Sequence, residues 1–369
     1  MIKVLLLSDS SSVHTIKWAR ALFLSGVDVC VFGLNSCPLD TYTSFPDVRV
    51  VSSKIDADVI RASQGAIQKL QYFKVLPMLK RIIKEFKPDI VHAHYATSYG
   101  LLGALCGFHP YILSVWGSDI FDFPNVSFAH RSLVTFNLMR ADKILSTSHV
   151  MAIETRKYTG KAIEVTPFGI DLAVFKPQSV DSPFAPEDIV VGTVKALEEK
   201  YGIEYLIRAF HQVRCWHPQL PLKLLIVGGG SLDSYLKGLA SDLGLDDCVV
   251  FTGWVPYDDV PKYHNMLTVS VSVSNSESFG VAIIEASACE KPVVVSDVGG
   301  LPEVVEDGVT GIVVPPRDVT ATASAIECLA MGEELRLKMG HAGRERVKRL
   351  YDWNANVSQM IDIYKGLIS

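Results

Sequence analysis

The chain has 369 residues, more than one hydrophobic core usually organises, so its length predicts two domains. Its 49% apolar and 20% charged residues are typical of a folded globular protein, and no window approaches the roughly 20 uninterrupted apolar residues of a membrane-spanning helix. Residues 1–171 carry 18 Lys and Arg against 14 Asp and Glu, whereas the remainder carries 17 against 26, which indicates different partners for the two halves.

The first half alternates apolar segments with helical patterns. Its opening segment is expected to be a strand rather than a signal peptide, because the apolar run stops at Asp9, and a cytoplasmic location is expected. This alternation predicts a parallel sheet with helices on both faces. The expected strands are 3–9, 27–34, 48–53, 89–95, 111–117 and 142–148, with helices at about 15–25 and 62–86.

A segment with four prolines and no periodicity, residues 166–188, predicts a linker. A second alternating series follows it, so the expected fold class is α/β, with two doubly wound domains in tandem. Ligands of such domains lie beyond the carboxyl ends of the strands. The expected strands are 189–197, 222–230, 248–255, 267–274, 291–297 and 311–316, with helices at about 202–217, 231–243, 280–289 and 320–331.

Cysteine and histidine spacing argues against a metal centre. The seven cysteines are scattered without a CxxC pair, which favours free thiols in a reducing compartment. His92 and His94 alternate along a predicted strand and so point to one face. Two histidines at this spacing can bind a metal, but no acidic or cysteine partner is near in sequence. A structural or pocket-lining role is favoured over metal binding.

Two glutamates near a predicted helix start mark the strongest candidate site, the segment Glu277 to Glu285 (ESFGVAIIE). It follows a predicted strand, and the chain turns near Gly280 into a helix beginning near Val281. The first amides of that helix and its dipole favour an anion such as a diphosphate. Carboxylates there are suited to sugar or ribose hydroxyls. The alternative, that both glutamates merely decorate a helix start, stays open on the segment alone.

The spacing of these glutamates resembles the E-x7-E motif of the retaining glycosyltransferases of family 4, which have the GT-B fold: two Rossmann-like domains facing across a cleft. The resemblance covers most of the chain, because other pieces occur in the expected order. These pieces are FGIDLAVFKP (168–177), GTVKALEEKYGIEYLIRAF (192–210), LLIVGGG (224–230), FTGWV (251–255) and VVVSDVGGLPEVVEDGVTGIVVPP (293–316).

The resemblance implies a role for each end of the motif. Glu277 would bind hydroxyls of the transferred sugar and Glu285 those of the ribose. It also implies an acceptor-binding domain over 1–170, with the C-terminal helix 353–369 packing back on it, and a donor-binding domain over 171–352. The remaining donor-binding residues it implies are Ser278, the amides of Phe279, Gly280 and Val281 at the diphosphate, Gly229 in the GGG turn, and Val255 in the nucleobase loop.

Two lysines flank the turn after the strand at 189–197. Fixed cations there would stabilise the charge that develops on a departing diphosphate. The bland alternative is a solvated pair beside Glu198 and Glu199. In the family pattern an Arg stands at the place of Lys195 and a Lys at the place of Lys200, so this chain lacks the planar guanidinium fork at the first position.

The N-terminal half departs from the family pattern in two places. The loop after the first strand, SDSSSVHT (8–15), has no glycine, and the segment SVWGSDI (114–120) has Trp116 where a histidine is usual. Trp116 can stack on a sugar face, and Asp119 is the polar candidate beside it. His14 opens the next helix, where it can contact a ligand or simply neighbour a helix cap.

The resemblance thus implies a metal-independent, retaining glycosyltransferase without a cofactor, acting on a UDP- or GDP-type sugar. The expected acceptors are saccharides or lipid-linked saccharides of bacterial surface polysaccharide or glycolipid synthesis, and no nucleic-acid partner is expected. The basic amphipathic stretch 69–87 suits a peripheral contact with anionic lipid at the inner face of the membrane, or else an ordinary solvated helix.

Three other functions remain in view. A nucleotide-sugar epimerase would consume donor without acceptor. A dinucleotide oxidoreductase would need a GxGxxG turn after an early strand, which SDSSSVHT does not supply. A non-catalytic sugar-nucleotide-binding protein would not need the cations at Lys195 and Lys200.

Overall fold

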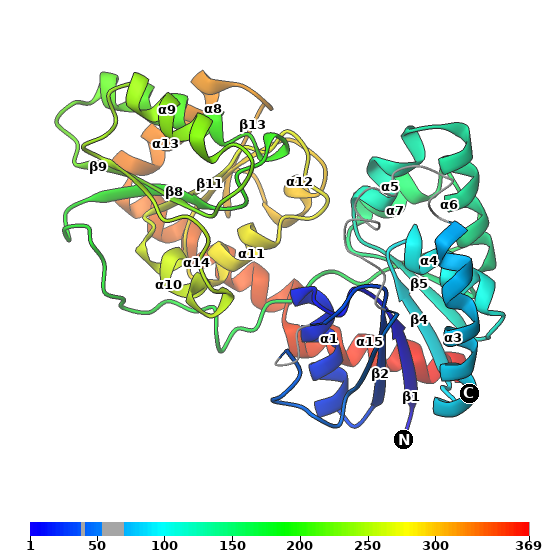
Figure 1. Cartoon of the computed structure of the whole chain (residues 1–369). Helices are drawn as coiled ribbons and strands as arrows, with labels where there is room; N and C mark the ends of the chain where they lie inside the picture. The colour runs from blue at the N-terminus through cyan, green and yellow to red at the C-terminus, as the bar shows by residue number, and fades with distance from the viewer. Residues whose placement is uncertain (38–40, 54–69, 369) are drawn as a thin grey trace. The chain divides into compact units, whose positions relative to one another are not determined.

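The computed structural model describes residues 1–37, 41–53 and 70–368, and the chain divides into two compact units. The first unit consists of Met1–Pro167 with Ala355–Ser369, and the second of Phe168–Asn354. Each unit is a parallel sheet with helices packed on it (Figure 1). The predicted fold class, two doubly wound α/β domains, is therefore confirmed.

The sheet of the first unit has the strand order β3-β2-β1-β4-β5-β6-β7 among the described residues. Neighbouring strands are parallel, and the central pairs place Leu5 opposite Cys30 on one side and Val91 on the other. The strands from β2 to β6 in this order are almost wholly buried, which explains their continuous apolar sequences, whereas the edge strands β3 and β7 are partly exposed. Their bounds are β1 Lys3–Leu7, β2 Asp28–Gly33, β3 Arg49–Ser52, β4 Ile90–His94, β5 Tyr111–Val115, β6 Lys143–Ser146 and β7 Ile163–Val165.

Helices cover this sheet, and α4 packs against both α3 and α6 (Figure 1). The expected helix over 62–86 is seen from Leu70 onward, and residues 62–69 lie outside the described residues. Helix α15 is bound to β7 and the segment after it, because Gln359 donates to the Val165 carbonyl at 3.2 Å. The helices are α1 Val13–Leu24, α3 Leu70–Phe86, α4 Ser98–Cys106, α5 Ser118–Phe121, α6 Phe128–Arg140, α7 His149–Thr155 and α15 Trp353–Ile368, with the 3-10 turn η1 Phe123–Asn125.

The second unit repeats the plan with the strand order β10-β9-β8-β11-β12-β13. All its pairs are parallel, and Val293, Val294 and Val295 of β12 are fully buried. The strands are β8 Ile189–Val194, β9 Leu222–Val227, β10 Val249–Phe251, β11 Val269–Ser272, β12 Val293–Ser296 and β13 Gly311–Val314. The helices are α8 Ile203–Trp216, α9 Asp233–Asp242, α10 Val260–Met266, α11 Val281–Ala288, α12 Leu301–Val304, α13 Val319–Met331 and α14 Glu333–Leu350, with 3-10 turns η2 Glu199–Tyr201 and η3 Tyr257–Asp259.

The proline-rich segment between β7 and β8 carries no helix or strand, as its composition predicts. All seven cysteines lie in the described parts of the chain and are free thiols. Across those same parts, no helix has both the length and the apolar character that crossing a bilayer requires.

Candidate functional site

The sheet of the second unit reverses its strand order between β8 and β11. These strands are neighbours, yet the chain leaves β8 toward β9 and later continues from β11 toward β12. The loops after them therefore diverge at the carboxyl edge, which is the usual ligand position in a doubly wound sheet. Lys195 and Lys200 lie in the loop after β8, and Glu277 lies in the loop after β11. The structure thus places all three predicted catalytic residues at this switch point.

Direct contacts join these residues. Lys195 Nζ lies 2.5 Å from Glu277 Oε2, and both side chains are mostly buried, 13% and 10% exposed. The ammonium groups of Lys195 and Lys200 lie over the ring of Tyr201, at 4.3 and 4.8 Å from its centroid. Such cation–π contacts favour both cations where they stand. The sequence did not single out Tyr201, although its place directly after Lys200 is a signal for this contact.

The alternative, a solvated lysine pair beside Glu198 and Glu199, does not hold for Lys195, which is mostly buried against Glu277. Lys200 is exposed, as that alternative expects. The Glu198 carboxylate instead accepts hydrogen bonds from the backbone N–H and the hydroxyl of Ser231, at 2.9 and 2.5 Å. The carbonyl of Lys200 accepts from the N–H groups of Asn275 and Ser276, at 2.8 and 3.1 Å. These bonds tie the loop after β8 to the loops after β9 and β11.

Glycines shape the entry into α11. Gly280 has φ +105°, which a residue with a side chain rarely adopts, and it immediately precedes Val281, the first residue of the helix. A Cβ on Gly299 would lie 1.8 Å from the carbonyl oxygen of Glu277. The loop of Gly299 therefore packs directly under the candidate sugar glutamate. Phe279, in the same loop, is 2% exposed and packs edge-on against the rings of Phe168 and Tyr351.

Glu285 lies in the second turn of α11 and is 5% exposed. Its Oε1 accepts a hydrogen bond from the hydroxyl of Tyr257 at 3.0 Å, and its Oε2 lies 3.5 Å from Nε2 of His264. Burial, and then the charge of Glu285, raises the pKa of Tyr257, so this phenol remains a hydrogen-bond donor. The carboxylate is therefore fixed on one side, and its chemistry suits a further hydroxyl donor.

Gly229 and Val255 lie on the loops after β9 and β10. A Cβ on Gly229 would lie 2.6 Å from Nε1 of Trp254, an indole that is itself 75% exposed. The N–H of Gly228 donates to the carbonyl of Gly253 at 3.0 Å, which joins the two loops. Val255 is partly buried against a small cluster beneath them. These loops belong to the same edge of the sheet as the lysines and Glu277.

The first unit also has a switch point, between β1 and β4. A cavity of about 240 Å³ lies there. Trp116 stacks on His94, with ring centroids 4.4 Å apart, and His14 meets the same indole edge-on at 5.9 Å. The structure thus joins two of the three predicted pocket residues. The lining residues are Ser8, Asp9, Ser12, His94, Tyr95, Ser98, Tyr99 and Trp116.

Asp119, the third predicted pocket residue, is fully buried beneath this turn. Its carboxylate accepts backbone hydrogen bonds from Ala96 and Gly117, each at 2.7 Å, and from Trp116 at 3.2 Å. Burial raises the pKa of Asp119 to about 6, and those backbone donors partly offset the rise. Its observed contacts tie the loop that carries Trp116 to the loop after β4.

The two strand histidines are held by hydrogen bonds. His92 is buried between the hydroxyls of Tyr364 and Ser114, at 2.8 and 2.7 Å from its two ring nitrogens. Nδ1 of His94 lies 3.1 Å from the hydroxyl of Ser8. Within the described residues, no third metal-ligating side chain joins them. The contacts agree with the structural and pocket-lining interpretation.

Acidification should destabilise the protein through these histidines. Burial lowers the pKa of His92 to about 3 and that of His94 well below its usual value, so both stay neutral when folded. A histidine in the unfolded chain becomes protonated below about pH 6.5. Below that pH, each of the two buried histidines should therefore lower the free energy of unfolding by about 1.4 kcal/mol per pH unit. Asp119 opposes this loss below pH 6, because its raised pKa makes the folded state bind the proton first.

Melting temperatures measured from pH 7.5 to 5 test this expectation. The wild-type chain should melt at progressively lower temperature below pH 6.5, and His92→Asn should flatten that slope even if it melts lower at every pH. An equal slope in the variant would show that His92 contributes nothing to it.

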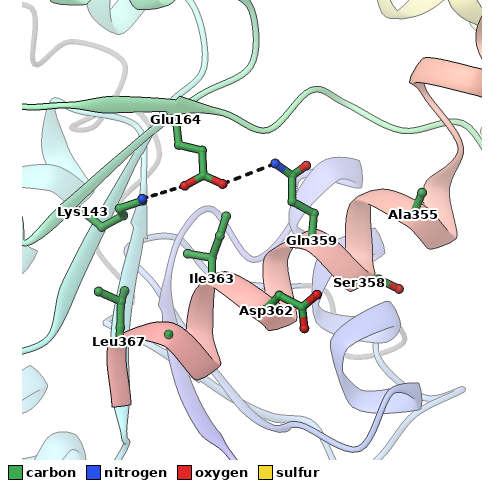
Figure 2. Close-up of a pocket in the computed structure, with 9 residues that line it drawn as sticks. Lys143, Glu164, Ala355, Ser358, Gln359, Asp362, Ile363 and Leu367 are labelled. Carbon is green, nitrogen blue, oxygen red and sulfur yellow. Dashed lines mark hydrogen bonds and ion pairs between the residues drawn. The ribbon is translucent and has the colours of Figure 1, made fainter. Parts of the chain in front are cut away.

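A larger cavity, about 690 Å³, lies elsewhere on the first unit and contains none of the predicted site residues. Figure 2 shows that it lies along α15, beside an ion pair between Lys143 and Glu164 at 2.6 Å. Gln359 also reaches Glu164, at 3.4 Å. Lys143, Glu164 and Gln359 bind one another here, which indicates that this cavity borders the surface on which α15 packs.

Comparison with known proteins gives the same picture for both units. The model of the family "Glycosyl transferases group 1" matches residues 175–346, and that of "Glycosyl transferase 4-like" matches residues 3–148. A D-inositol 3-phosphate glycosyltransferase of Corynebacterium jeikeium is 27% identical over 318 residues, covering 76% of this chain and 72% of the relative. A GDP-mannose-dependent mannosyltransferase of Mycolicibacterium smegmatis is 33% identical over 218 residues, which span 56% of each protein.

Solved structures resemble the whole chain. Sucrose-phosphate synthase from Thermosynechococcus elongatus superposes with a TM-score of 0.82 at 24% identity, covering 100% of this chain and 99% of the other. Anabaena HepE, solved with UDP and glucose, gives a TM-score of 0.80 at 19% identity, with both chains covered completely. At these identities the likeness establishes the fold.

Proposed function

Because the chain belongs to the group 1 glycosyl transferases of the family 4 type and has the GT-B fold, we propose that this glycosyltransferase takes its sugar from a nucleotide diphosphate. One observation carries the proposal: Lys195, Lys200 and Glu277 converge at the β8–β11 switch point, beside the first turn of α11. The arrangement combines cations for a diphosphate with a carboxylate for sugar hydroxyls.

In the proposed mechanism, the chain's own residues stabilise the departing diphosphate. The helix N-terminus at Gly280 and Val281 binds phosphate oxygens through unpaired N–H groups. Lys200, and Lys195 once Glu277 turns to the sugar, offset the negative charge that grows as the glycosidic bond breaks. The departing diphosphate oxygen accepts the proton that the acceptor hydroxyl gives up, so no side chain has to act as the base. The acceptor hydroxyl attacks from the face that the leaving group departs from, which retains the anomeric configuration.

The donor is proposed to be a UDP- or GDP-type sugar. Support comes from the relatives, one of which is named GDP-mannose-dependent, and from the solved complex of HepE with UDP. A thermal-shift screen of UDP, GDP and ADP with their sugars tests this, because a ligand at 100 times its Kd stabilises by about 2.7 kcal/mol. Stabilisation by none of them would contradict the proposal.

The reaction course is tested with the donor that binds best. Anomeric analysis of the product by NMR should give retention, and inversion would refute the proposed course. Donor turned into an isomeric nucleotide sugar without acceptor would instead identify an epimerase. The acceptor is proposed to be a saccharide or lipid-linked saccharide of surface polysaccharide or glycolipid synthesis.

Peripheral contact with anionic lipid is a second part of the proposal. The apolar stripe of α3 is buried in the core, so its exposed side offers basic residues with Phe73 and Met78, 49% and 37% exposed. Helix α6 offers more apolar surface, since Phe128 is 85% and Met139 63% exposed. That helix carries two arginines and no acidic residue, which suits an anionic bilayer.

A sedimentation assay separates these two helices. Wild-type protein should co-sediment with vesicles containing phosphatidylglycerol and not with pure phosphatidylcholine. Phe128→Ala with Met139→Ala should weaken binding about a hundredfold or more, given about 1.5–3 kcal/mol for each large apolar side chain removed from water. Leu337→Ala, which removes a side chain that is 68% exposed on the second unit, is the matched control. Undiminished binding would exclude α6, and Lys80→Glu with Lys84→Glu would then test α3.

A further inference from the structure

The surroundings of Glu285 contain two aromatic side chains that the sequence did not single out. Tyr257 donates its hydroxyl proton to Oε1 of the glutamate, and His264 faces Oε2. His264 is fully buried, and neither of its ring nitrogens has a hydrogen-bond partner among the described residues. A buried polar group without a partner requires an explanation. A shift of about 0.5 Å would bring Nε2 within ordinary hydrogen-bond distance of the carboxylate.

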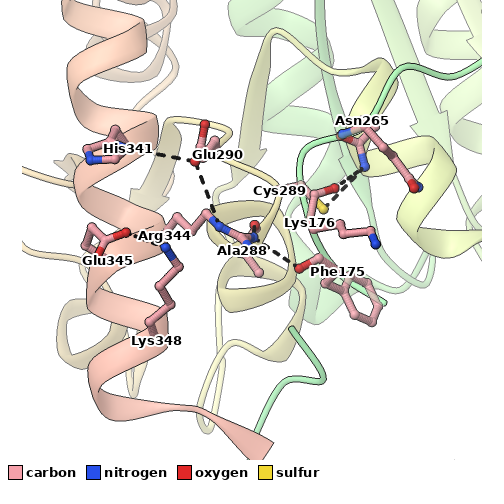
Figure 3. A network of polar contacts seen from close by, with 11 residues as sticks. Phe175, Lys176, Asn265, Ala288, Cys289, Glu290, His341, Arg344, Glu345 and Lys348 are labelled. Atoms are coloured by element: carbon pink, nitrogen blue, oxygen red, sulfur yellow. Dashed lines mark hydrogen bonds and ion pairs between the residues drawn. The ribbon is translucent and has the colours of Figure 1, made fainter. Parts of the chain in front are cut away.

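A rigid base supports both rings. Phe175 is 1% exposed and packs against Tyr257 and His264, with ring centroids 6.1 and 6.2 Å away. Figure 3 shows Arg344 reaching from α14 to the carbonyls of Phe175 and Ala288. Ala288 is the last residue of α11. The guanidinium of Arg344 therefore binds both the backbone at Phe175, on which the two rings pack, and the helix that carries Glu285.

A second hydrogen bond fixes the backbone next to Phe175. The amide of Asn265, the residue after His264, donates to the carbonyl of Lys176, the residue after Phe175, at 3.0 Å (Figure 3). The chain around the cluster is therefore fixed from α10, from α14 and from the segment before β8. Side chains locked in this way hold a functional group close to one geometry.

We propose that Tyr257 is a positioning residue for recognition of the donor ribose, acting through Glu285. This rests on the proposed function, in which the carboxylate of Glu285 accepts hydrogen bonds from the ribose hydroxyls. A free carboxylate rotates between several arrangements, whereas the hydroxyl of Tyr257 fixes its plane and leaves acceptor capacity for a diol. His264 confines the second oxygen from the buried side.

Tyr257 also joins two parts of the donor site. It follows Val255 by two residues, on the loop that leads from β10 into α10, whereas Glu285 stands on α11. Its hydrogen bond therefore couples the predicted nucleobase loop to the predicted ribose contact. Removing that one oxygen should weaken recognition of the ribose without touching Lys195, Lys200 or Glu277.

The test compares ribose and deoxyribose nucleotides. Isothermal titration with UDP and 2′-deoxy-UDP, or the GDP pair if GDP binds better, gives the ratio of the two Kd values. Wild-type protein should prefer the ribonucleotide at least tenfold, about the effect of one well-placed hydrogen bond to a charged group. Tyr257→Phe should weaken ribonucleotide binding about tenfold and bring the ratio close to one, while kcat at saturating donor changes less than twofold.

Controls separate the possible failures. Tyr235 forms another hydrogen bond to a glutamate, Glu204, at 2.9 Å on the exposed side of this unit, so Tyr235→Phe should leave the ratio unchanged. Full discrimination in Tyr257→Phe would overturn the inference alone. If wild-type protein bound the ribo and 2′-deoxy nucleotides equally well, the proposed contact between Glu285 and the ribose would itself be refuted. Tyr257→His, which keeps a donor, should recover part of the lost ratio.

Discussion

Replacing Lys200 with alanine should reduce turnover by about 10²- to 10³-fold, the effect expected when one preorganised electrostatic contact to a developing charge is lost. Lys200 is exposed and stands over Tyr201, and its carbonyl is held by Asn275 and Ser276. The substitution removes a cation without leaving a cavity or a buried unpaired charge. The fold should therefore be unaffected, and the loss should appear in kcat.

Lys200 gives a cleaner test than its neighbour. Removing Lys195 would leave the mostly buried carboxylate of Glu277 without its partner, so stability and catalysis would change together. Lys338→Ala, an exposed lysine on α14, serves as the matched control and should retain full activity. Near-normal kcat in Lys200→Ala would contradict the assigned role.

Replacing Gly299 with alanine should impair donor binding, because the new side chain would displace Glu277. Its φ of +52° is strained for any residue with a side chain, and the new Cβ would lie 1.8 Å from the carbonyl oxygen of Glu277. The N–H of Gly300 donates to that same oxygen at 3.0 Å, so the loop has no room to accommodate the methyl group. We expect a displaced Glu277, a donor KM raised at least tenfold and a melting temperature lower by several degrees.

Gly308→Ala separates backbone strain from the close contact. Gly308 has φ +73°, but a Cβ there meets nothing within 4 Å. It should cost only the strain of the left-handed conformation, about 1–2 kcal/mol, and leave donor KM unchanged. If Gly299→Ala behaved like Gly308→Ala in steady-state kinetics, the loop of Gly299 would have no part in holding Glu277.

The strands of the described residues could be predicted, except β7, because most parallel strands are buried on both faces and apolar throughout. The three residues of β7, Ile163–Val165, are only partly buried and form too short a run to be recognised. The predicted strands run too far at their carboxyl ends. The interval 189–197 was expected as a strand, but β8 ends at Val194, and the following loop carries Lys195. The apolar pattern continues into that loop because Leu197 is fully buried.

Helix α14 was not predicted, for a physical reason. Its buried positions are Met339, Gly340, Gly343 and Val347, so two glycines interrupt the apolar stripe at helical spacing. Gly340 lies so close to the backbone of Glu290 that a Cβ would be 2.2 Å from that carbonyl oxygen. Close packing of a glycine face stabilises this helix, and a pattern search for apolar residues does not detect such a face.

The site was predictable as far as its residue types and strand ends. The E-x7-E spacing and the two lysines identified the switch point, since each follows a strand that the apolar pattern marks. The partners could not be predicted, because they depend on three-dimensional neighbours. Tyr257 and His264 meet Glu285 from another loop and helix, and nothing in their spacing from it indicates a contact.

The proposed catalysis requires a nucleotide diphosphate to bind at the carboxyl ends of β8 and β11. A crystal structure with the nucleotide that stabilises the protein most tests it directly. The diphosphate should lie within hydrogen-bond distance of Lys200 Nζ and of the N–H groups at Gly280 and Val281, with the ribose beside Glu285. A diphosphate bound elsewhere, for example in the cavity lined by Ser8 and Trp116, would contradict it.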